Sequence, residues 1–395
     1  MLSDIKRKSL PEIAKVAGMH DAQPLQNFLT DSPWSVIYLR DRRLELTIKM
    51  LEGRPFKLVI DETGDKKKGN HTDYVTRQYI GNLGKVDNGI VSVNAYGVLG
   101  DLTFPLMFLV YKPRKRLESG CAYKTKPELA VEIIEYLLKL GFNFDLVLAD
   151  SLYGESPTFI SVLDKYKKHY LLAIRSNNTE LVSLEQKATH ETWSEFERLF
   201  SDGKVEKRYI QQITFSSEKA ITYWRVTNDT ENLPRNQTWY VKTDLKSDMA
   251  FQLGNLYGFR NWIEYAFKQC KNELGWSDFR LTDYHQIEKW WEVVMSAYFL
   301  VSLQAQARNK IDNNNQISSP NSAEPADYSK HQWWDFKRGW KSTLNNLRLI
   351  IQPYVFWNLI KPWLTIFLNP NLQLGFQKIL EIMNLFQGYI HVDSG

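Results

Sequence analysis

Two short apolar segments that each end in an aspartate most constrain what this chain can fold into. Residues 56–61 ("FKLVID") and 144–150 ("FDLVLAD") consist mainly of branched and aromatic side chains, which is typical of buried β-strands. In α/β sheets, ligands bind at the carboxyl ends of the strands. We therefore expect Asp61 and Asp150 to lie at one edge of a sheet, where two carboxylates repel each other unless a cation lies between them. Taken alone, each is more often a cap or turn residue.

The segments around these two strands predict an α/β arrangement. Further strands are expected at residues 89–100, 102–113 and 169–176, the first two joined by a tight Gly100–Asp101 turn. Amphipathic helices are expected at 126–140 and 156–166. The order β-β-β-α-β-α-β predicts a mixed sheet, in which an antiparallel hairpin lies beside parallel strands.

The rest of the chain divides by composition. We expect six parts: a helical N-terminal region (1–52) with a helix-turn-helix-like start, a first core part (53–176), a β-rich insertion (177–237), a second core part (238–310), a flexible linker (311–330) and a helical C-terminal region (331–395). A plain packing bundle explains residues 1–52 equally well. The helical pattern there starts so abruptly that we expect the natural chain to extend further upstream.

Composition limits the class of protein. The net charge of +5 permits a polyanionic partner without proving one. Only two cysteines occur and they form no CxxC pair, so we expect no disulfide framework, no cysteine zinc site and a reducing compartment. From the charged residues that follow Met1 we expect no signal peptide. The most apolar stretch, 350–368, contains Pro353, Lys361 and Pro362, which favours bent soluble helices over a membrane span.

Residues 257–275 carry a third acid among cations. On a helix of 100° per residue, Tyr257, Arg260, Glu264 and Lys271 lie within about 60° of one another, with Lys268 beside them. An ordinary solvated face with i,i+4 ion pairs is the alternative. A stripe of one acid among a tyrosine, an arginine and two lysines instead suits the binding of a phosphate backbone around a metal ligand.

These residues resemble a known family. The spacing Y-(2)-R-(3)-E-(6)-K from Tyr257 to Lys271 is that of the IS4-type DDE transposases. The stretch "DETGDKKKGNHTDYVTRQYIGNLGKVDNG" resembles the first-aspartate region of the related IS701 group, and "VLADSLYG" resembles its second-aspartate region. The resemblance covers roughly residues 20–370, and all three motifs together are far more specific than any one of them.

The resemblance implies an RNase H-like mixed sheet with helices on both faces, a β-rich insertion subdomain, and helical N- and C-terminal regions. Its catalytic and metal-binding residues would be Asp61, Asp150 and Glu264, holding two Mg²⁺ ions that Mn²⁺ can replace. The neighbouring acids Glu62, Asp65, Asp145 and Glu155 lie off the motif. A helical N-terminal region would bind DNA. The residues expected to contact DNA are Tyr257, Arg260, Lys268, Lys271, Trp239, Lys66, Lys67, Lys68, Arg77 and, less directly, Lys85.

The resemblance also implies a function. The expected reaction cuts an insertion sequence at its terminal inverted repeats and joins the 3′-OH ends to target DNA, with a hairpin route left open. Trp239 would then support a flipped base, with Trp262 as the competing residue. We expect double-stranded DNA and a second copy of the chain as partners, a bacterial cytoplasmic, nucleoid-associated location, no membrane and no nucleotide cofactor. Two alternatives remain: a non-catalytic DNA-binding protein or repressor, and an RNase H-like nuclease that only hydrolyses.

Overall fold

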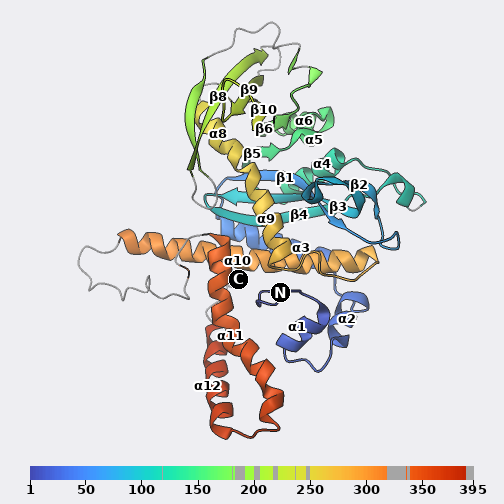
Figure 1. Cartoon of the computed structure of the whole chain (residues 1–395), viewed down its shortest axis with the longest axis vertical. Coiled ribbons are helices and arrows are strands. Elements are labelled where there is room, and N and C mark those ends of the chain that lie inside the picture. Colours follow the sequence, from blue (N-terminus) through green and yellow to red (C-terminus); the bar gives the residue numbers. More distant parts are fainter. Residues whose placement is uncertain are drawn as a thin grey trace. The chain divides into compact units, whose positions relative to one another are not determined.

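The computed structural model divides the chain into two compact units, each described here by itself (Figure 1). The sheet unit comprises residues 38–268 and 282–284, and the helical unit comprises residues 1–37, 269–281 and 285–395. The structure describes the whole chain except residues 118, 180, 183–191, 200–204, 217–220, 236, 246–249, 318–334, 336–338 and 388–395.

The sheet unit is built on one mixed sheet. Its first half contains β1 (Phe56–Lys66), β2 (Thr76–Ile80), β3 (Lys85–Leu99), β4 (Leu102–Val110), β5 (Phe144–Ala149) and β6 (His169–Ile174), with the helices α3 (Val36–Leu51), α4 (Lys126–Lys139), α5 (Ser151–Gly154) and α6 (Pro157–Lys165). The predicted strands and helices are all present, and β2 is an additional short strand that the sequence pattern did not indicate.

The strand order confirms the RNase H-like arrangement. The strands run β4-β3-β1-β5-β6, where β3 is antiparallel to both β4 and β1, while β1, β5 and β6 are parallel. Gly100, at φ +61°, allows the two-residue turn in which Leu99 pairs with Leu102. Helices lie on both faces of this sheet, and Figure 1 shows α9 crossing it over β1 and β4.

The strand that carries Asp61 is longer than predicted. We expected it to end at Asp61 and to open into a turn. Instead β1 continues to Lys66, because its antiparallel pairing with β3 persists from Lys57 opposite Val98 to Lys66 opposite Gly89. Its parallel pairing with β5 stops at Ile60 opposite Ala149. Asp61 is therefore the first residue of β1 that extends past the end of its parallel neighbour.

The insertion continues the same sheet. Its strands are β7 (Ser194–Leu199), β8 (Val205–Ser216) and β9 (Ile221–Thr227), and β10 (Thr238–Thr243) joins them to the core by pairing with β6 on one side and β9 on the other. The sheet thus runs on as β6-β10-β9-β8-β7. The β-rich character predicted for residues 177–237 is present in the part of that segment that the structure describes.

We had predicted that the signature segment, residues 257–275, forms a single helix, and this prediction is wrong. It forms α8 (Ala250–Gly258) and α9 (Arg260–Asn272), which are separated at Phe259. Gly258 is the residue before the break, and its conformational freedom weakens a helix interior. Tyr257 therefore lies at the end of one helix, whereas Arg260 and Glu264 lie in the first turns of the next.

The helical unit contains α1 (Leu10–Val16), α2 (Gln23–Thr30), most of α10 (Tyr284–Ile317), α11 (Trp340–Leu364) and α12 (Pro370–Gln387). A stacked pair of buried indoles, Trp276 and Trp291, with ring centroids 4.6 Å apart, lies in its core. Helix α11 contains Pro353 and Pro362. None of the helices in the described part of the chain combines the length and apolar content needed to cross a bilayer.

The first residues of the predicted linker are helical. Residues 311–317 belong to α10, which ends at Ile317, because no Gly or Pro interrupts the helix before Pro320. The remainder of the predicted linker lies outside the described residues. Both cysteines are free, Cys121 exposed and Cys270 buried, which agrees with the expected lack of a disulfide.

Gly154 links the fold to the position of Asp150. A Cβ atom added at Gly154 would lie 2.0 Å from the backbone oxygen of Ala173 on β6. The short helix α5 can therefore approach the sheet only through a glycine at this position. Because Asp150 is the N-cap of α5, this contact helps fix the orientation of its carboxylate.

We predict that Gly154→Ala destabilises the protein by about 1–3 kcal/mol, since a methyl group forced against backbone must displace α5. The matched control is Gly81→Ala, because nothing lies within 4 Å of a Cβ atom there. Urea unfolding measures both variants. Equal stability of the two would show that α5 moves away from β6 at no cost.

Candidate active site

Two aspartates meet where β1 extends past β5. Asp61 is a buried residue of β1, and Asp150 directly follows β5, where its side chain accepts a hydrogen bond from the backbone N–H of Leu152 at 2.9 Å. The Oδ1 atom of Asp61 accepts from the N–H of Glu62 at 2.8 Å. The structure thus brings together the two strand-terminal acids that the sequence singled out.

A third carboxylate in this cluster is Glu62, which the motif comparison had set aside. Carboxylate oxygens of Asp61, Glu62 and Asp150 lie within 4.8 Å of one another. Glu62 accepts hydrogen bonds from Lys126 Nζ on one oxygen and from Tyr153 Oη on the other, both at 3.0 Å. The adjacent acidic pair "DE" in the sequence was the available signal. Strand alternation alone places the side chains of neighbouring residues on opposite faces, so it does not predict that Glu62 and Asp61 belong to one cluster.

The start of α4 places Lys126 at this cluster. Thr125 and Glu128 form a capping box, in which each side chain bonds the other residue's backbone N–H. Lys126 is the first residue of the helix and lies directly after the cap. Its ammonium group compensates the charge of Glu62, so one of the three carboxylates already has a cationic partner.

The guanidinium of Arg260 lies between two of the predicted catalytic acids. Its Nη2 is 3.8 Å from Asp61 Oδ2, and its Nη1 is 3.5 Å from Glu264 Oε1. Glu264 itself is half-exposed and does not belong to the carboxylate cluster. Arg260 Nε is buried and has no hydrogen-bond partner in the described structure. The third acid of the predicted triad therefore faces the first across an arginine.

The pKa values at the site follow from burial and from these charges. Burial raises the pKa of Asp61 to about 7, although Arg260 opposes the rise. Burial and the charge of Glu62 raise the pKa of Asp150. Burial by itself lowers the pKa of Arg260, but its anionic neighbours outweigh that effect, and the net pKa lies above its ordinary value. The negative charge of the carboxylates at this site thus exceeds the positive charge of the neighbouring cations.

Tyr257 belongs to the same site although it lies on a different helix from Arg260. It is buried, and burial raises the pKa of its hydroxyl, with Arg260 opposing and Asp150 adding to the rise. These influences require that Tyr257 lies close to both charged groups. The break at Phe259 therefore keeps the signature tyrosine near the signature arginine.

The donors at this site fit a hard divalent cation. Three carboxylates supply oxygen atoms, the ligands that Mg²⁺ and Mn²⁺ prefer. Asn94 pairs with Asp61 in the strand register, and its buried Oδ1 accepts no hydrogen bond in the described structure. This group of oxygen atoms stabilises a cation. Asp61 and Asp150 are best placed to hold it, since both oxygens of Glu62 are engaged.

A cluster of buried arginines beside the site was missed by the sequence analysis. Arg198 on β7 and Arg208 on β8 are each less than a tenth exposed, at 7% and 8%. Their guanidinium carbons lie 5.9 Å and 5.3 Å from the ring centre of Trp239 on β10. Alternation along these strands was the available signal, since "EFERL" and "VEKRYI" place both arginines on the face of Phe196.

This arginine cluster lies near the end of α8, because the Nε of Arg198 is 3.8 Å from the position of a Cβ atom added at Gly258. Burial and the like charge of Arg208 lower the pKa of Arg198, whereas Tyr257 and Glu264 oppose that change. Arg208 donates from Nη2 to Glu206 at 2.7 Å, and its buried Nε and Nη1 have no partner in the described structure. Leaving buried N–H donors without hydrogen bonds lowers stability. Arg208, with two unpaired buried donors beside a second guanidinium, is arranged to receive an anion.

The lysine run lies further from Asp61 than expected. Lys66 is five strand residues beyond Asp61, which corresponds to about 16 Å. It forms an ion pair with Asp87 at 2.6 Å. Burial lowers the pKa of Lys67, and Lys68, Arg77 and Lys85 are exposed. These cations line the far end of β1 and its hairpin partner instead of surrounding the carboxylates, because β1 does not turn after Asp61.

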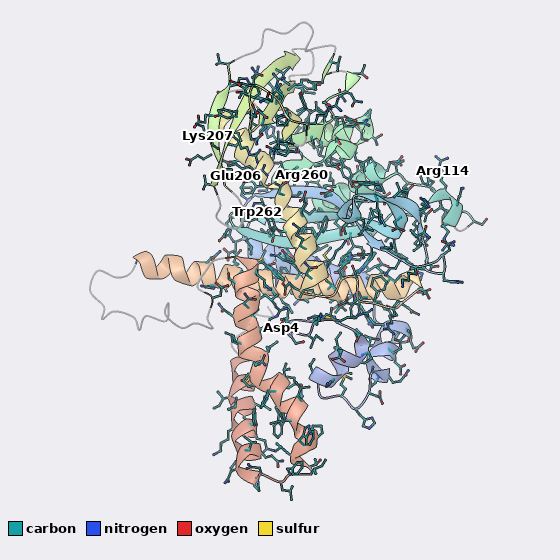
Figure 2. All side chains as sticks on the ribbon, in the orientation of Figure 1. Asp4, Arg114, Glu206, Lys207, Arg260 and Trp262 are labelled. Atoms are coloured by element: carbon teal, nitrogen blue, oxygen red, sulfur yellow. The ribbon has the colours of Figure 1, made fainter. Side chains whose placement is uncertain are left out.

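The remaining predicted contacts lie along α9 and its flanks. Lys268 is exposed, with its Nζ 5.3 Å from the ring centre of Tyr265. Lys271 is on the same helix but belongs to the helical unit. Trp262, the alternative to Trp239 as the support for a flipped base, packs against Phe259 with the two ring centres 5.6 Å apart. Figure 2 marks Arg260 and Trp262 on α9, and Glu206 and Lys207 on the insertion strand β8.

Comparison with known proteins defines the class to which this site belongs. Residues 1–190 match the DDE superfamily endonucleases, and residues 122–300 match the transposase DDE domain. The chain is 55% identical over 288 residues to a protein of Microchaete diplosiphon described as "Probable transposase for insertion sequence element IS701", a match that covers 73% of this chain and 76% of the relative. The chain thus has the fold and the sequence of a DDE-type endonuclease.

The chain belongs to the IS701 family of transposases. It is a DNA transposase, and the DDE class to which it belongs uses divalent metal ions and acts on DNA. A solved structure, the NurA nuclease from Sulfolobus solfataricus, covers 56% of this chain and 82% of its own at 10% identity, with a TM-score of 0.24. A match at that level carries no argument.

We predict that Arg208→Met weakens DNA binding with little change in stability. Removing one of two buried like charges relieves repulsion and desolvation. It also breaks the ion pair with the partly exposed Glu206, so the free energy of unfolding should change by no more than about 1 kcal/mol. Losing one phosphate contact lowers the slope of log affinity against log salt by about 0.9. The matched control is Lys207→Met on the opposite face of β8. A destabilised variant with an unchanged salt slope would make the arginine structural.

Proposed function

We propose that this transposase cuts its insertion sequence at the terminal inverted repeats and joins the 3′-OH ends to target DNA by metal-dependent phosphoryl transfer. The observation that carries the proposal is the convergence of Asp61, Asp150 and Arg260 from β1, β5 and α9, with Glu264 on the other side of Arg260. Three separate segments meet at this point, and each carries one motif of the family.

Asp61, Asp150 and Glu264 are proposed as the metal-binding and catalytic acids, with two Mg²⁺ ions as the physiological metals and Mn²⁺ as a substitute. A bound metal supplies an acidified water and neutralises charge on the leaving oxygen. Asp61 and Asp150 hold their carboxylates in place through backbone N–H bonds at 2.8 Å and 2.9 Å. Glu264, on an exposed face of α9, approaches them when Arg260 releases it.

Arg260 is proposed to transfer from these acids to DNA. It has a buried Nε donor without a partner and two weak contacts at 3.5 Å and 3.8 Å. A phosphate oxygen offers a stronger, charge-assisted hydrogen bond. The exchange orients the scissile phosphate and frees both carboxylates at the same time. Tyr257, which lies beside Arg260, is proposed to bind the same phosphate.

The wider DNA contact is proposed to involve further residues of the chain. The residues concerned are Lys268, Lys271, Trp239, Lys66, Lys67, Lys68 and Arg77, together with the helical N-terminal region. A homodimer on two element ends is proposed for the DNA complex, acting in the bacterial cytoplasm on nucleoid DNA. A repressor without catalysis has no need for Arg260 between two acids. A nuclease that only hydrolyses has no need for the buried pair Arg198 and Arg208.

The triad has a direct test. Asp61→Asn, Asp150→Asn and Glu264→Gln are each expected to lower cleavage of labelled inverted-repeat DNA by at least about a thousandfold, because metal-assisted activation supplies several kcal/mol of barrier lowering. Binding of the same DNA in a gel-shift assay should persist. If any one variant cleaves at a near-normal rate, the residue altered in it does not belong to the triad.

Two neighbouring acids serve as controls for this test. Asp145→Asn should stay active, since Asp145 only pairs with Lys57 on the adjacent strand. Glu62→Gln should also retain cleavage, because an amide still accepts from Lys126 and donates to Tyr153. A loss in Glu62→Gln as large as that in Asp61→Asn would move the first metal ligand from Asp61 to Glu62.

Trp239 is proposed to support a flipped base beside a hairpin end. Its ring lies against two guanidiniums that can bind the flanking phosphates, and one base-stacking contact contributes about 1–3 kcal/mol. We predict that Trp239→Ala leaves first-strand nicking intact and lowers hairpin formation about tenfold or more. Gel analysis of duplex and pre-nicked substrates separates the two steps. If both steps fall together, Trp239 is structural and the hairpin route loses its support.

A further inference from the structure

The loop between β4 and α4 carries a concentration of positive charge that the site described so far does not use. Residues 111–126 ("YKPRKRLESGCAYKTK") contain six cations: Lys112, Arg114, Lys115, Arg116, Lys124 and Lys126. Lys124 pairs with Glu132, and Lys126 pairs with Glu62. For the other four, no ion pair is present within the described part of the chain. Their charge is therefore not compensated by carboxylates there.

Three of these four cations are held by neutral partners. Arg116 donates from Nη2 to the backbone oxygens of Asn70 and Thr72 at 2.6 Å and 2.8 Å. The guanidinium of Arg114 lies 4.3 Å from the ring centre of Tyr123, and Lys112 Nζ lies 4.8 Å from that of Tyr74. Carbonyl and aromatic contacts fix a cation without cancelling its charge. The loop thus presents ordered positive charge to an external anion.

An open groove of about 300 Å³ connects this loop to the carboxylates. It is lined by Gln78, Tyr111, Tyr123, Thr125, Lys126, Pro127 and Leu152. Leu152 donates its N–H to Asp150, and Lys126 donates to Glu62, so one end of the groove adjoins the site. Tyr111 and Tyr123, joined through their hydroxyls at 2.9 Å, lead toward Arg114. Figure 2 shows Arg114 at the outer edge of this part of the sheet unit.

The groove and the arginine cluster lie on opposite sides of the carboxylates in the sheet order. Most of the groove is formed next to β2, β4 and α4, on the β3 side of β1, and Leu152 of α5 closes its end at the carboxylates. Arg198, Arg208 and Trp239 come from β7, β8 and β10, which lie beyond β6 on the other side. A DNA strand with its scissile phosphate at Asp61 and Asp150 would extend in both directions.

We propose that this groove binds the DNA strand on the far side of the cut from Trp239, with phosphates on Arg114 and Lys115 and a base against Tyr123. Basic residues interleaved with aromatic rings are the usual means of binding a single strand without sequence preference. The inference rests on the proposed function, in which the side of Trp239 holds the element end. The groove then takes DNA outside the element: flanking DNA before cleavage and target DNA at joining.

The first test compares two DNAs with the double variant Arg114→Ala/Lys115→Ala. One DNA stops at the cut and the other carries a single-stranded extension past it. Affinity for the extended DNA should fall about tenfold and its salt slope by about 1.4, that is about 0.7 for each lost single-strand phosphate, while the short DNA binds as before. Equal losses on both DNAs, or no loss on either, overturn the proposal.

The matched control for that test is Lys139→Ala, an exposed lysine at the other end of α4. Thermal unfolding confirms that both variants remain folded. Cleavage by the unaltered protein with Mg²⁺ is measured separately. A lack of cleavage would contradict the proposed function. An equal effect of the double variant on the long and the short DNA would contradict only the role of the groove.

The second test uses Cys121, which is exposed in this loop, whereas Cys270 is buried. An iron chelate attached to Cys121 generates hydroxyl radicals that cut nearby DNA. The probe is used in two complexes, one with uncut DNA that carries the flank and one with cleaved ends and target DNA. Cuts outside the element in either complex support the proposal, and they identify whether flanking or target DNA occupies the groove. Cuts confined to the element side overturn it. The control moves the probe to α6 with Cys121→Ser/Ser161→Cys.

Discussion

Repulsion between carboxylates that the fold forces together is the interaction on which the rest of this structure depends. Asp61, Glu62 and Asp150 lie within 4.8 Å of one another, where each like-charge pair costs about 3 kcal/mol at an effective dielectric constant of 20. Burial, to which the neighbouring carboxylates add, raises the pKa of Asp61 to about 7, and Lys126 and Arg260 lie against the acids. We propose that a divalent cation replaces the proton and that a phosphate draws Arg260 away.

The origin of this cluster is a difference in strand pairing. Because β1 continues along β3 after its pairing with β5 has ended, Asp61 remains on a rigid strand while the chain at Asp150 turns into α5. The ligand set is therefore fixed by hydrogen bonds of the backbone on one side and by the close approach of Gly154 to β6 on the other. A loop at Asp61 would have left the first acid mobile, and metal sites need rigid support.

Much of the core could be predicted from the sequence, and what could not follows a physical pattern. The apolar strands at 56–61 and 144–150 have periodicities that report burial directly, so both acids were identified. Helical winding of residues 257–275 placed Arg260 and Glu264 correctly on one helix face, yet it could not show the break at Phe259, where Gly258 weakens the helix. The persistence of β1 to Lys66 depends on pairing with a strand about thirty residues away. A local pattern of turn-forming residues cannot report such pairing.

The same limit explains why the arginines of the insertion were overlooked. Arg198 and Arg208 are ordinary alternating strand residues in the sequence, and only the pairing of β7, β8, β9 and β10 places them over Trp239. Their position also gives the insertion a physical role. Because β10 pairs with both β6 and β9, the insertion strands are a direct extension of the catalytic sheet. If these buried arginines bind a phosphate, as we propose, continuous backbone pairing through β9, β10 and β6 fixes the position of that phosphate relative to Asp150.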